Sequence, residues 1–304
     1  MRVLITGGAG FIGSHIVDAH IEKGDDVLIV DNLSTGKEEN INPKARFEKS
    51  DIRDDLKDIF NGFRPDVVNH HAAQINVRRS EEDPIEDAMI NIIGIINILN
   101  MVRRFNVPRF IFASSGGTVY GETEQLPTRV DHQLQPFSPY GISKVAGERY
   151  IKTILRDTTT KYTILRYANI YGPRQNPKSE AGVIAIFINN IIDEKPCIIY
   201  GDGEQTRDYV HVFDCVSANL LALERPSGSY NIGTGVETSV NQLIEMLRDL
   251  TGKSFEYKHG DPRPGELRRS VLDFSCAQKK LGWRPRISLR SGIEDTFKYY
   301  KSAL

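Results

Sequence analysis

The N-terminal segment constrains what this chain can fold into more than any other part. The apolar run at residues 3–6 is typical of a buried strand, and it leads directly into Gly7, Gly10 and Gly13 and then into a helix-like stretch. Glycine lets the backbone turn sharply and approach phosphate groups, and a helix start offers unpaired N–H groups to their negative charge. This order of strand, glycines and helix predicts a binding loop for a dinucleotide pyrophosphate.

The next expected strand ends in an acidic residue, Asp31. A carboxylate at this point can accept hydrogen bonds from the ribose of adenosine. No arginine follows Asp31 directly, and its charge would repel a 2′-phosphate, so the sequence favours NAD over NADP. Asp51 follows the third expected strand, where it either meets the adenine end of the cofactor or caps a helix beginning near Asp54.

The first half of the chain alternates short apolar runs with helix-like segments. Strands are expected at residues 3–6, 26–30, 46–49, 67–70, 110–113 and 162–166. Strands separated by helices form a parallel sheet with right-handed crossovers. We therefore predict an α/β protein, with a Rossmann-like parallel sheet covered by helices on both faces and a smaller α/β substrate-binding lobe towards the C-terminus. The expected NAD-binding domain comprises residues 1–168 and about 207–230, and the lobe comprises about 169–206 and 231–304.

The composition argues against several classes of partner. The 39 basic residues nearly balance the 40 acidic ones, which disfavours nucleic acid and acidic membrane surfaces. A core strand at the start leaves no room for a signal peptide, and no apolar run approaches the roughly 18 residues of a membrane span. The three cysteines are widely spaced and match no metal-ligand pattern. We expect a cytoplasmic protein without a metal site, a membrane partner or a nucleic-acid partner.

A second motif, Tyr140-Gly-Ile-Ser-Lys144, points to acid–base chemistry. Residues four apart on a helix share one face, so Tyr140 and Lys144 can address the same cavity. Tyrosine with its ordinary pKa near 10 is a poor base at neutral pH. A cation within roughly 4–6 Å lowers that pKa towards the working range, and Lys144 supplies such a charge.

The fifth expected strand ends in hydroxyls and glycines, Ala113-Ser-Ser-Gly-Gly-Thr118. Open α/β sheets place their chemistry at the carboxyl ends of strands. A hydroxyl there can bond both a reacting sugar oxygen and the Tyr140 oxygen, and so relay the proton. We predict Ser115 for this role, with Ser114 and Thr118 as the alternatives.

Together, the glycine motif, the Ser115 strand end and Tyr140-x-x-x-Lys144 resemble the extended short-chain dehydrogenase/reductases, and within them the UDP-glucose (UDP-galactose) 4-epimerases. The resemblance covers nearly the whole chain. Its further segments are Asp31-Asn-Leu-Ser-Thr-Gly36, His70-His-Ala-Ala73, Asn91, Arg166-Tyr-Ala-Asn169, Tyr171-Gly-Pro-Arg174, Arg207-Asp-Tyr-Val-His211 and Arg263-Pro-Gly-Glu266. Two features depart from the family: the Ser115 segment is one residue longer than the commonest epimerase form, and Gln74-Ile75 stands where some members have a cofactor-binding lysine.

The resemblance implies NAD as the cofactor and assigns residues to both ligands. The NAD set is Gly7, Gly10, Phe11, Ile12, Gly13, Asp31, Asn32, Ser34, Thr35, Gly36, Asp51, Ile52, Ala72, Ala73, Asn91, Tyr140, Lys144 and Tyr167. The substrate set is Ser115, Tyr140, Asn169, Arg207, Arg263, Glu266 and Ser270. In it the two arginines bind the diphosphate, Asn169 lies on the phosphate or sugar side, and Glu266 accepts from the uridine ribose. Ser270 lies near the C2 substituent of the sugar, and its small side chain predicts tolerance of UDP-GlcNAc and UDP-GalNAc.

The implied activity is that of an isomerase that interconverts UDP-galactose and UDP-glucose. Hydride leaves C4 and returns to it through a 4-keto intermediate, while Tyr140 takes and returns the hydroxyl proton. A 4,6-dehydratase typically carries Thr-Asp-Glu at the strand end, which is absent here. A UDP-glucuronate 4-epimerase or decarboxylase is the alternative enzyme, and a nonenzymatic NAD-sensing regulator is the alternative of another class. In this family, helices corresponding to residues 92–102 and 143–155 form the four-helix bundle of a dimer, which implies a homodimer.

Overall fold

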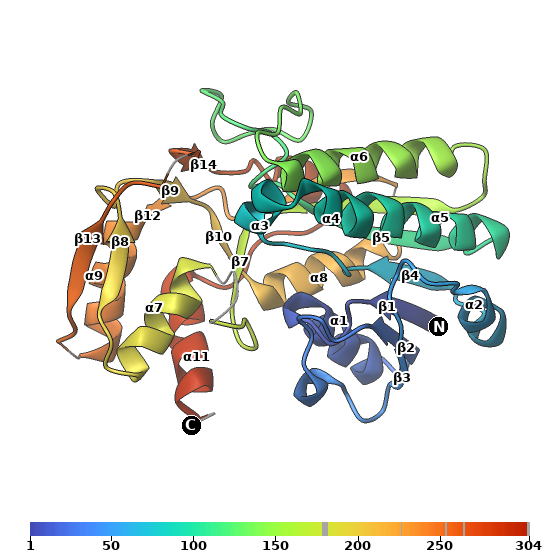
Figure 1. The fold of residues 1–304 in the computed structure, drawn as a ribbon, viewed down its shortest axis with the longest axis horizontal. Coiled ribbons are helices and arrows are strands. Elements are labelled where there is room, and N and C mark those ends of the chain that lie inside the picture. Colours follow the sequence, from blue (N-terminus) through green and yellow to red (C-terminus); the bar gives the residue numbers. More distant parts are fainter. Residues whose placement is uncertain (178–181, 226, 253, 264, 303–304) are drawn as a thin grey trace.

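The computed structural model describes residues 1–177, 182–225, 227–252, 254–263 and 265–302. Within these ranges, seven strands form one parallel sheet in the order β11-β6-β5-β4-β1-β2-β3 (Figure 1). They are β1 (Arg2–Thr6), β2 (Asp26–Asp31), β3 (Arg46–Lys49), β4 (Val67–His70), β5 (Arg109–Ser115), β6 (Lys161–Tyr167) and β11 (Gly228–Ile232). The strand order reverses between β1 and β4, and open sheets of this kind bind ligands beyond the strand ends at that point.

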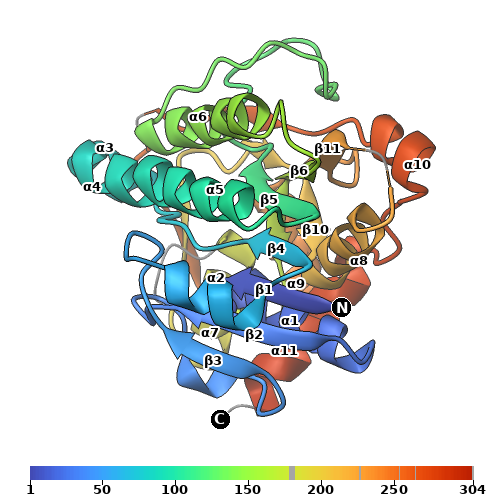
Figure 2. The same ribbon diagram turned by 90° about the vertical axis from the view of Figure 1, so that its right-hand side faces the viewer.

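Helices cover both faces of the sheet, as Figure 2 shows along its edge. One face carries α1 (Phe11–Glu22), α8 (Val212–Ala222) and α10 (Ser275–Leu281), and the other carries α2 (Lys57–Phe63), α5 (Gly94–Arg104) and α6 (Pro139–Ile154). The strand residues alternate between these layers: Val3 and Ile5 join the α1 side, whereas Leu4 joins the α5 side. The predicted α/β fold with two covered faces is confirmed.

One long helical stretch, Pro84–Arg104, lies beside α6. It follows α3 (Val77–Glu82) and comprises α4 (Pro84–Ala88), the π-helical η2 (Met89–Ile93) and α5. By length and composition this stretch could cross a membrane, contrary to the sequence expectation that no apolar segment approaches that length. Buried core helices of soluble proteins can be equally long and apolar. Asn97 in this stretch donates hydrogen bonds to the carbonyls of Ile52 and Asp54, which lie on the neighbouring segment of the fold.

A smaller group of elements lies at the left of Figure 1 and has its own apolar core. It contains α7 (Val183–Ile192), β8 (Cys197–Tyr200), α9 (Val240–Thr251), β13 (Tyr257–Gly260) and α11 (Leu289–Ser302). Short strands connect it to the main sheet: β7 (Asn169–Tyr171) pairs with β10 (Tyr209–His211), and β9 (Thr206–Arg207) lies between β12 (Thr238–Ser239) and β14 (Arg269–Ser270). The lobe is therefore built from chain segments on both sides of β11.

The helix expected near Asp54 begins only at Lys57, so of the two alternatives for Asp51 the helix cap does not hold. The Asp51 carboxylate instead accepts the backbone N–H of Arg53 at 2.9 Å, and the Asp54 N–H bonds to the Asp51 carbonyl at 3.0 Å. These local bonds hold residues 51–54 in a turn, because an aspartate side chain that binds its own backbone competes with helix formation.

Candidate active site

The three glycines form a tight turn between β1 and α1. Gly7 has a φ of +70°, and a Cβ atom there would lie 2.6 Å from the backbone nitrogen of Ala72. A Cβ on Gly13 would collide with the Gly7 carbonyl oxygen. Within the described ranges, no side chain caps the start of α1 at Gly10, so the first N–H groups of the helix stay available. The turn, with Phe11 and Ile12 opening the helix, fits the pyrophosphate of a dinucleotide.

Asp31 lies at the end of β2 and fastens the glycine turn. Its carboxylate accepts the backbone N–H of Ala9 at 3.0 Å and that of Leu33 at 2.9 Å. Gly36 packs against the same carboxylate, leaving no space for a Cβ, whereas Ser34 and Thr35 are exposed. Asp31 is thus buried at the rim where an adenosine ribose would lie.

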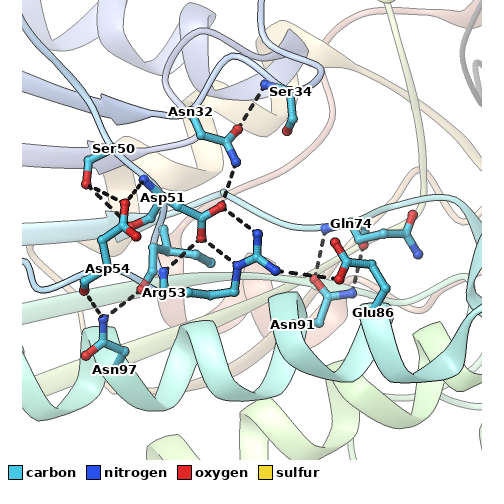
Figure 3. A network of polar contacts seen from close by, with 11 residues as sticks. Asn32, Ser34, Ser50, Asp51, Arg53, Asp54, Gln74, Glu86, Asn91 and Asn97 are labelled. Carbon is cyan, nitrogen blue, oxygen red and sulfur yellow. Dashed lines mark hydrogen bonds and ion pairs between the residues drawn. The ribbon is translucent and has the colours of Figure 1, made fainter.

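Asp51 joins the loop after β2 to the long helix (Figure 3). It accepts hydrogen bonds from Asn32 Nδ2 at 2.8 Å and from Arg53 Nε and Nη2 at 2.8 and 2.9 Å. Arg53 also pairs with Glu86 at 3.6 Å. Hydrogen bonds from Arg53 lower the pKa of Asp51 to about 2, so this carboxylate stays ionised. Ile52, beside it, is buried against Gly94.

Among the described residues, Asn91 forms no hydrogen bond with any other residue of the predicted NAD set. Its Oδ1 accepts the Gln74 N–H at 3.0 Å, and its Nδ2 donates to the Gln74 carbonyl at 2.8 Å (Figure 3). The same Nδ2 donates to Asp87 at 2.9 Å. Gln74 also donates to the buried Asp87. Asn91 thus shapes the loop after β4, in which Ala72 donates its N–H to Thr6 Oγ1 and Ala73 is half-buried.

Tyr140 and Lys144 lie on one face of α6, as the sequence predicts. Ser138 caps the helix by accepting the Gly141 N–H at 3.1 Å. Lys144 is 5% exposed; its Nζ donates to the Ala113 carbonyl at 3.0 Å and lies 5.7 Å from the Tyr140 ring centroid. Burial lowers the pKa of Lys144 to about 8, and the charges of Asp87 and Glu148 oppose that shift.

The three candidate hydroxyls have different surroundings. Ser114 is buried and donates to Glu148 Oε1 at 2.7 Å. Ser115 is half-buried at the end of β5, in register with the buried Tyr167 of β6. Thr118 Oγ1 is buried and has no hydrogen-bond partner within the described part of the chain. Ser114 is therefore committed to the protein interior, and Ser115 and Thr118 remain as candidates.

Most of the predicted substrate residues meet beside β9 and β14. Arg207 pairs with Glu266 at 3.1 Å and lies opposite Ser270 in the β9–β14 pairing. The Arg263 guanidinium stacks 3.7 Å from the centre of the Tyr200 ring. An open pocket of about 430 Å³ is lined by Tyr200, Gly201, Gln205, Arg263, Glu266 and Arg268, among others. Asn169 joins this group from the side of Gly117: its N–H donates to the carbonyl of Asp208, which directly follows Arg207, at 2.9 Å.

Sequence reasoning missed a buried charge pair behind the strand end. Glu148 and Arg166 form an ion pair at 2.6 Å with almost no exposed side-chain surface. Its one sequence signal was the position of Glu148, four residues after Lys144, which places it one helical turn further along the same face. Arg166 lies in the segment Arg166-Tyr-Ala-Asn169, which resembles the family, but no sequence pattern indicates that its side chain pairs with Glu148.

Comparisons with known proteins agree with this geometry. The NAD dependent epimerase/dehydratase family profile matches residues 3–233. The chain is similar to a putative UDP-glucose 4-epimerase of Methanocaldococcus jannaschii, with 51% identity covering 99% of this chain and 98% of the relative. The Thermotoga maritima UDP-glucose 4-epimerase structure with UDP-glucose has 47% identity and a TM-score of 0.98 over 100% and 99% of the two chains. The Thermus thermophilus UDP-glucose 4-epimerase structure with NAD has 41% identity and a TM-score of 0.96 over 100% of both.

Proposed function

Because the chain belongs to the NAD dependent epimerase/dehydratase family, we propose that it is an isomerase that interconverts UDP-galactose and UDP-glucose at C4. The observation that carries this proposal is the buried pair of Tyr140 and Lys144 on one face of α6, bonded to the strand that carries Ser115. Similarity to UDP-glucose 4-epimerases over essentially the whole chain supports the same activity.

The cofactor is NAD, which when bound accepts a hydride from C4 of the sugar and returns it. The glycine turn has no side chains in the way of a pyrophosphate, and the Asp31 carboxyl group at the end of β2 favours a ribose without a 2′-phosphate. We assign residues 1–168 and about 207–230 to NAD binding and residues about 169–206 and 231–304 to substrate binding. The separate apolar core of the smaller lobe supports this division, although α10, within 231–304, packs against the main sheet.

In the proposed mechanism, Tyr140 takes the proton of the C4 hydroxyl and later returns it. Lys144 is largely protonated below about pH 8, so its charge favours the phenolate form of Tyr140. Ser115 relays the proton between the sugar oxygen and Tyr140. Acid–base assistance of this kind contributes about 10²–10⁴-fold to the rate, and orientation of the sugar supplies much of the remainder.

On the substrate side, Arg207 and Arg263 bind the diphosphate, because guanidinium groups match phosphate oxygens in charge and geometry. Glu266 accepts a hydrogen bond from the uridine ribose. Because Glu266 is paired with Arg207 in this structure, that ion pair must break or Glu266 must bind both groups at once. Ser270 offers little bulk near the C2 substituent. We therefore propose that UDP-GlcNAc and UDP-GalNAc are also substrates.

We further propose a cytoplasmic homodimer. Five apolar side chains on the Pro84–Arg104 stretch and α6 are exposed, which supports an additional contact there: Ile85, Met89, Ile93, Ile142 and Tyr150. The cysteines Cys197, Cys215 and Cys276 are all free thiols, which agrees with a reducing compartment.

The test is conversion of UDP-galactose to UDP-glucose by purified protein without added cofactor, followed by chromatography. We expect conversion by the wild type and near-absence in Tyr140→Phe, which keeps the ring and removes only the hydroxyl. UDP-GalNAc in a parallel reaction tests the Ser270 argument. No conversion of UDP-galactose, even with NAD added, would overturn the proposal and make UDP-glucuronate the next substrate to test.

A further inference from the structure

A buried carboxylate connects the two elements that carry the proposed acid–base groups. Glu148 lies on α6, one turn beyond Lys144, and has no exposed surface. Its Oε1 accepts the hydroxyl of Ser114 at 2.7 Å, and Ser114 directly precedes Ser115 on β5. The carboxylate therefore joins the helix of Tyr140 and Lys144 to the strand end of Ser115.

Arg166 of β6 holds this carboxylate in place from the other side. Its Nε donates to Oε1 at 2.8 Å and its Nη2 donates to Oε2 at 2.6 Å, the two-point geometry that fixes a carboxylate plane. Its Nη1 donates to Tyr120 Oη at 2.8 Å and to the Val130 carbonyl at 2.9 Å. Arg166 binds Glu148 through Nε and Nη2 alone, which leaves Nη1 free to bind the segment that follows β5.

The network continues towards the substrate side. Tyr120 Oη donates to Asn231 Oδ1 of β11 at 2.5 Å, and Asn231 Nδ2 donates to the Thr128 carbonyl at 2.9 Å. The Thr128 N–H donates to the carbonyl of Val271 at 2.8 Å, next to Ser270. One chain of hydrogen bonds thus runs from the acid–base helix to the segment that carries Ser270.

Stability alone is a weak explanation for such a pair. Removing two charges from water is costly, and well-packed apolar residues of similar volume are often as stable as a buried ion pair. Direction and distance, by contrast, are properties that hydrogen bonds impose and apolar contacts do not. The pair lies behind groups whose mutual distance a proton transfer depends on.

We propose that Glu148 is a positioning residue: through Ser114 and Arg166 it sets the distance between Ser115 on β5 and Tyr140 on α6. The inference rests on the proposed epimerase function. It requires no contact between Glu148 and the substrate, since the carboxylate acts through the strand and the helix that it joins.

Ser114→Ala tests this link without leaving a buried charge unpaired, because Arg166 still binds Glu148. We expect kcat for UDP-galactose to fall about tenfold with KM within about twofold, because a misplaced catalytic group costs rate more than binding. Ser114→Thr keeps the hydroxyl and should recover most of kcat. Ser217→Ala, which removes a hydroxyl bonded to the Asp214 carbonyl at 2.7 Å in α8, is the matched control and should keep kcat.

Two results would overturn the proposal while the wild type is active. An unchanged kcat in Ser114→Ala with a lowered melting temperature would make the bond merely structural. A loss as large as that of Ser115→Ala would make Ser114 itself the reacting hydroxyl. Glu148→Gln provides a second measurement. The double variant Ser114→Ala/Glu148→Gln should lower kcat no more than the larger of the two single variants, because both changes act on the same Ser114–Glu148 bond. Absence of activity in the wild type would instead refute the proposed function.

Discussion

Lys144 occupies surroundings that oppose its own charge. Its ammonium group contacts one carbonyl oxygen and lies near the rings of Phe112 and Tyr140, with 5% of the residue exposed. Burial lowers its pKa to about 8, compared with about 10.4 for a lysine in an unfolded chain. A residue that destabilises the fold in this way is retained for what its charge does at the site.

Lys144→Met should therefore stabilise the protein while abolishing turnover. Below pH 8 the folded state must carry the buried charge, at a cost of roughly 3 kcal/mol. Above pH 8 the folded state has released the proton and the unfolded state has not, so this cost shrinks and disappears near pH 10.4. Urea unfolding of both proteins at pH 7 and pH 10 measures the difference. A gain in unfolding free energy that is as large at pH 10 as at pH 7 would contradict the lowered pKa of Lys144.

Ser115 and Thr118 can be separated by single substitutions. We expect Ser115→Ala to lower kcat by about 10²-fold or more, as removal of a proton relay does. Thr118→Val removes the buried Oγ1, which has no hydrogen-bond partner among the described residues, while keeping the side-chain shape. It should lower kcat less than Ser115→Ala. Initial rates with UDP-galactose measure both. The reverse order of effects would assign the relay to Thr118.

At the scale of elements, the turn between β1 and α1 leaves no tolerance for a side chain at Gly13. Gly13→Ala should push α1 away from the Gly7 carbonyl and weaken NAD binding at least tenfold, because the phosphate-binding N–H groups move with the helix. Calorimetric titration of NAD into cofactor-free protein measures this. Gly62→Ala is the control, because a Cβ there would meet nothing within 4 Å in the described part of the chain. Alanine is also the better helix former by about 1 kcal/mol. Equal NAD affinity in both variants would contradict the argument.

The elements predicted well from sequence are those whose pattern is local. The apolar runs of β1, β2 and β4 indicate strands at nearly their observed bounds, because these strands are buried on both faces of the sheet. β3 is a largely exposed strand, and only Phe47 in it is apolar. The start of α2 was missed because the side chain of Asp51 bonds its own backbone. Glu148 and Arg166 could not be predicted as a pair, since their burial depends on strands and helices far apart in the chain.

At the scale of the whole molecule, the Pro84–Arg104 stretch presents apolar side chains that this chain alone does not cover. Ile93 is 46% exposed and lies on the same stretch as the exposed Ile85 and Met89, so an apolar patch faces outwards there. Ile93→Lys should convert the proposed dimer to a monomer, because a charge at the centre of an apolar interface costs several kcal/mol unless it is paired. Sedimentation velocity at matched concentrations measures the mass.

Val236→Lys controls for the added charge, since Val236 is 60% exposed in the smaller lobe, away from the long helix. We expect this variant to sediment like the wild type. A wild type that sediments as a monomer would refute the dimer, and an Ile93→Lys protein that remains dimeric would place the interface elsewhere.

The two backbone bonds of Asp31 bear on how cofactor preference could be engineered in this scaffold. Replacing this acid with serine would remove the charge that repels a 2′-phosphate, but it would also release the N–H groups of Ala9 and Leu33 that keep the phosphate-binding turn in place. We expect Asp31→Ser to melt at a lower temperature even without cofactor, and to lose NAD affinity before it gains NADP affinity. An unchanged melting temperature would show that the turn keeps its shape without this carboxylate. A redesign for NADP would have to rebuild the loop as well as reverse the charge.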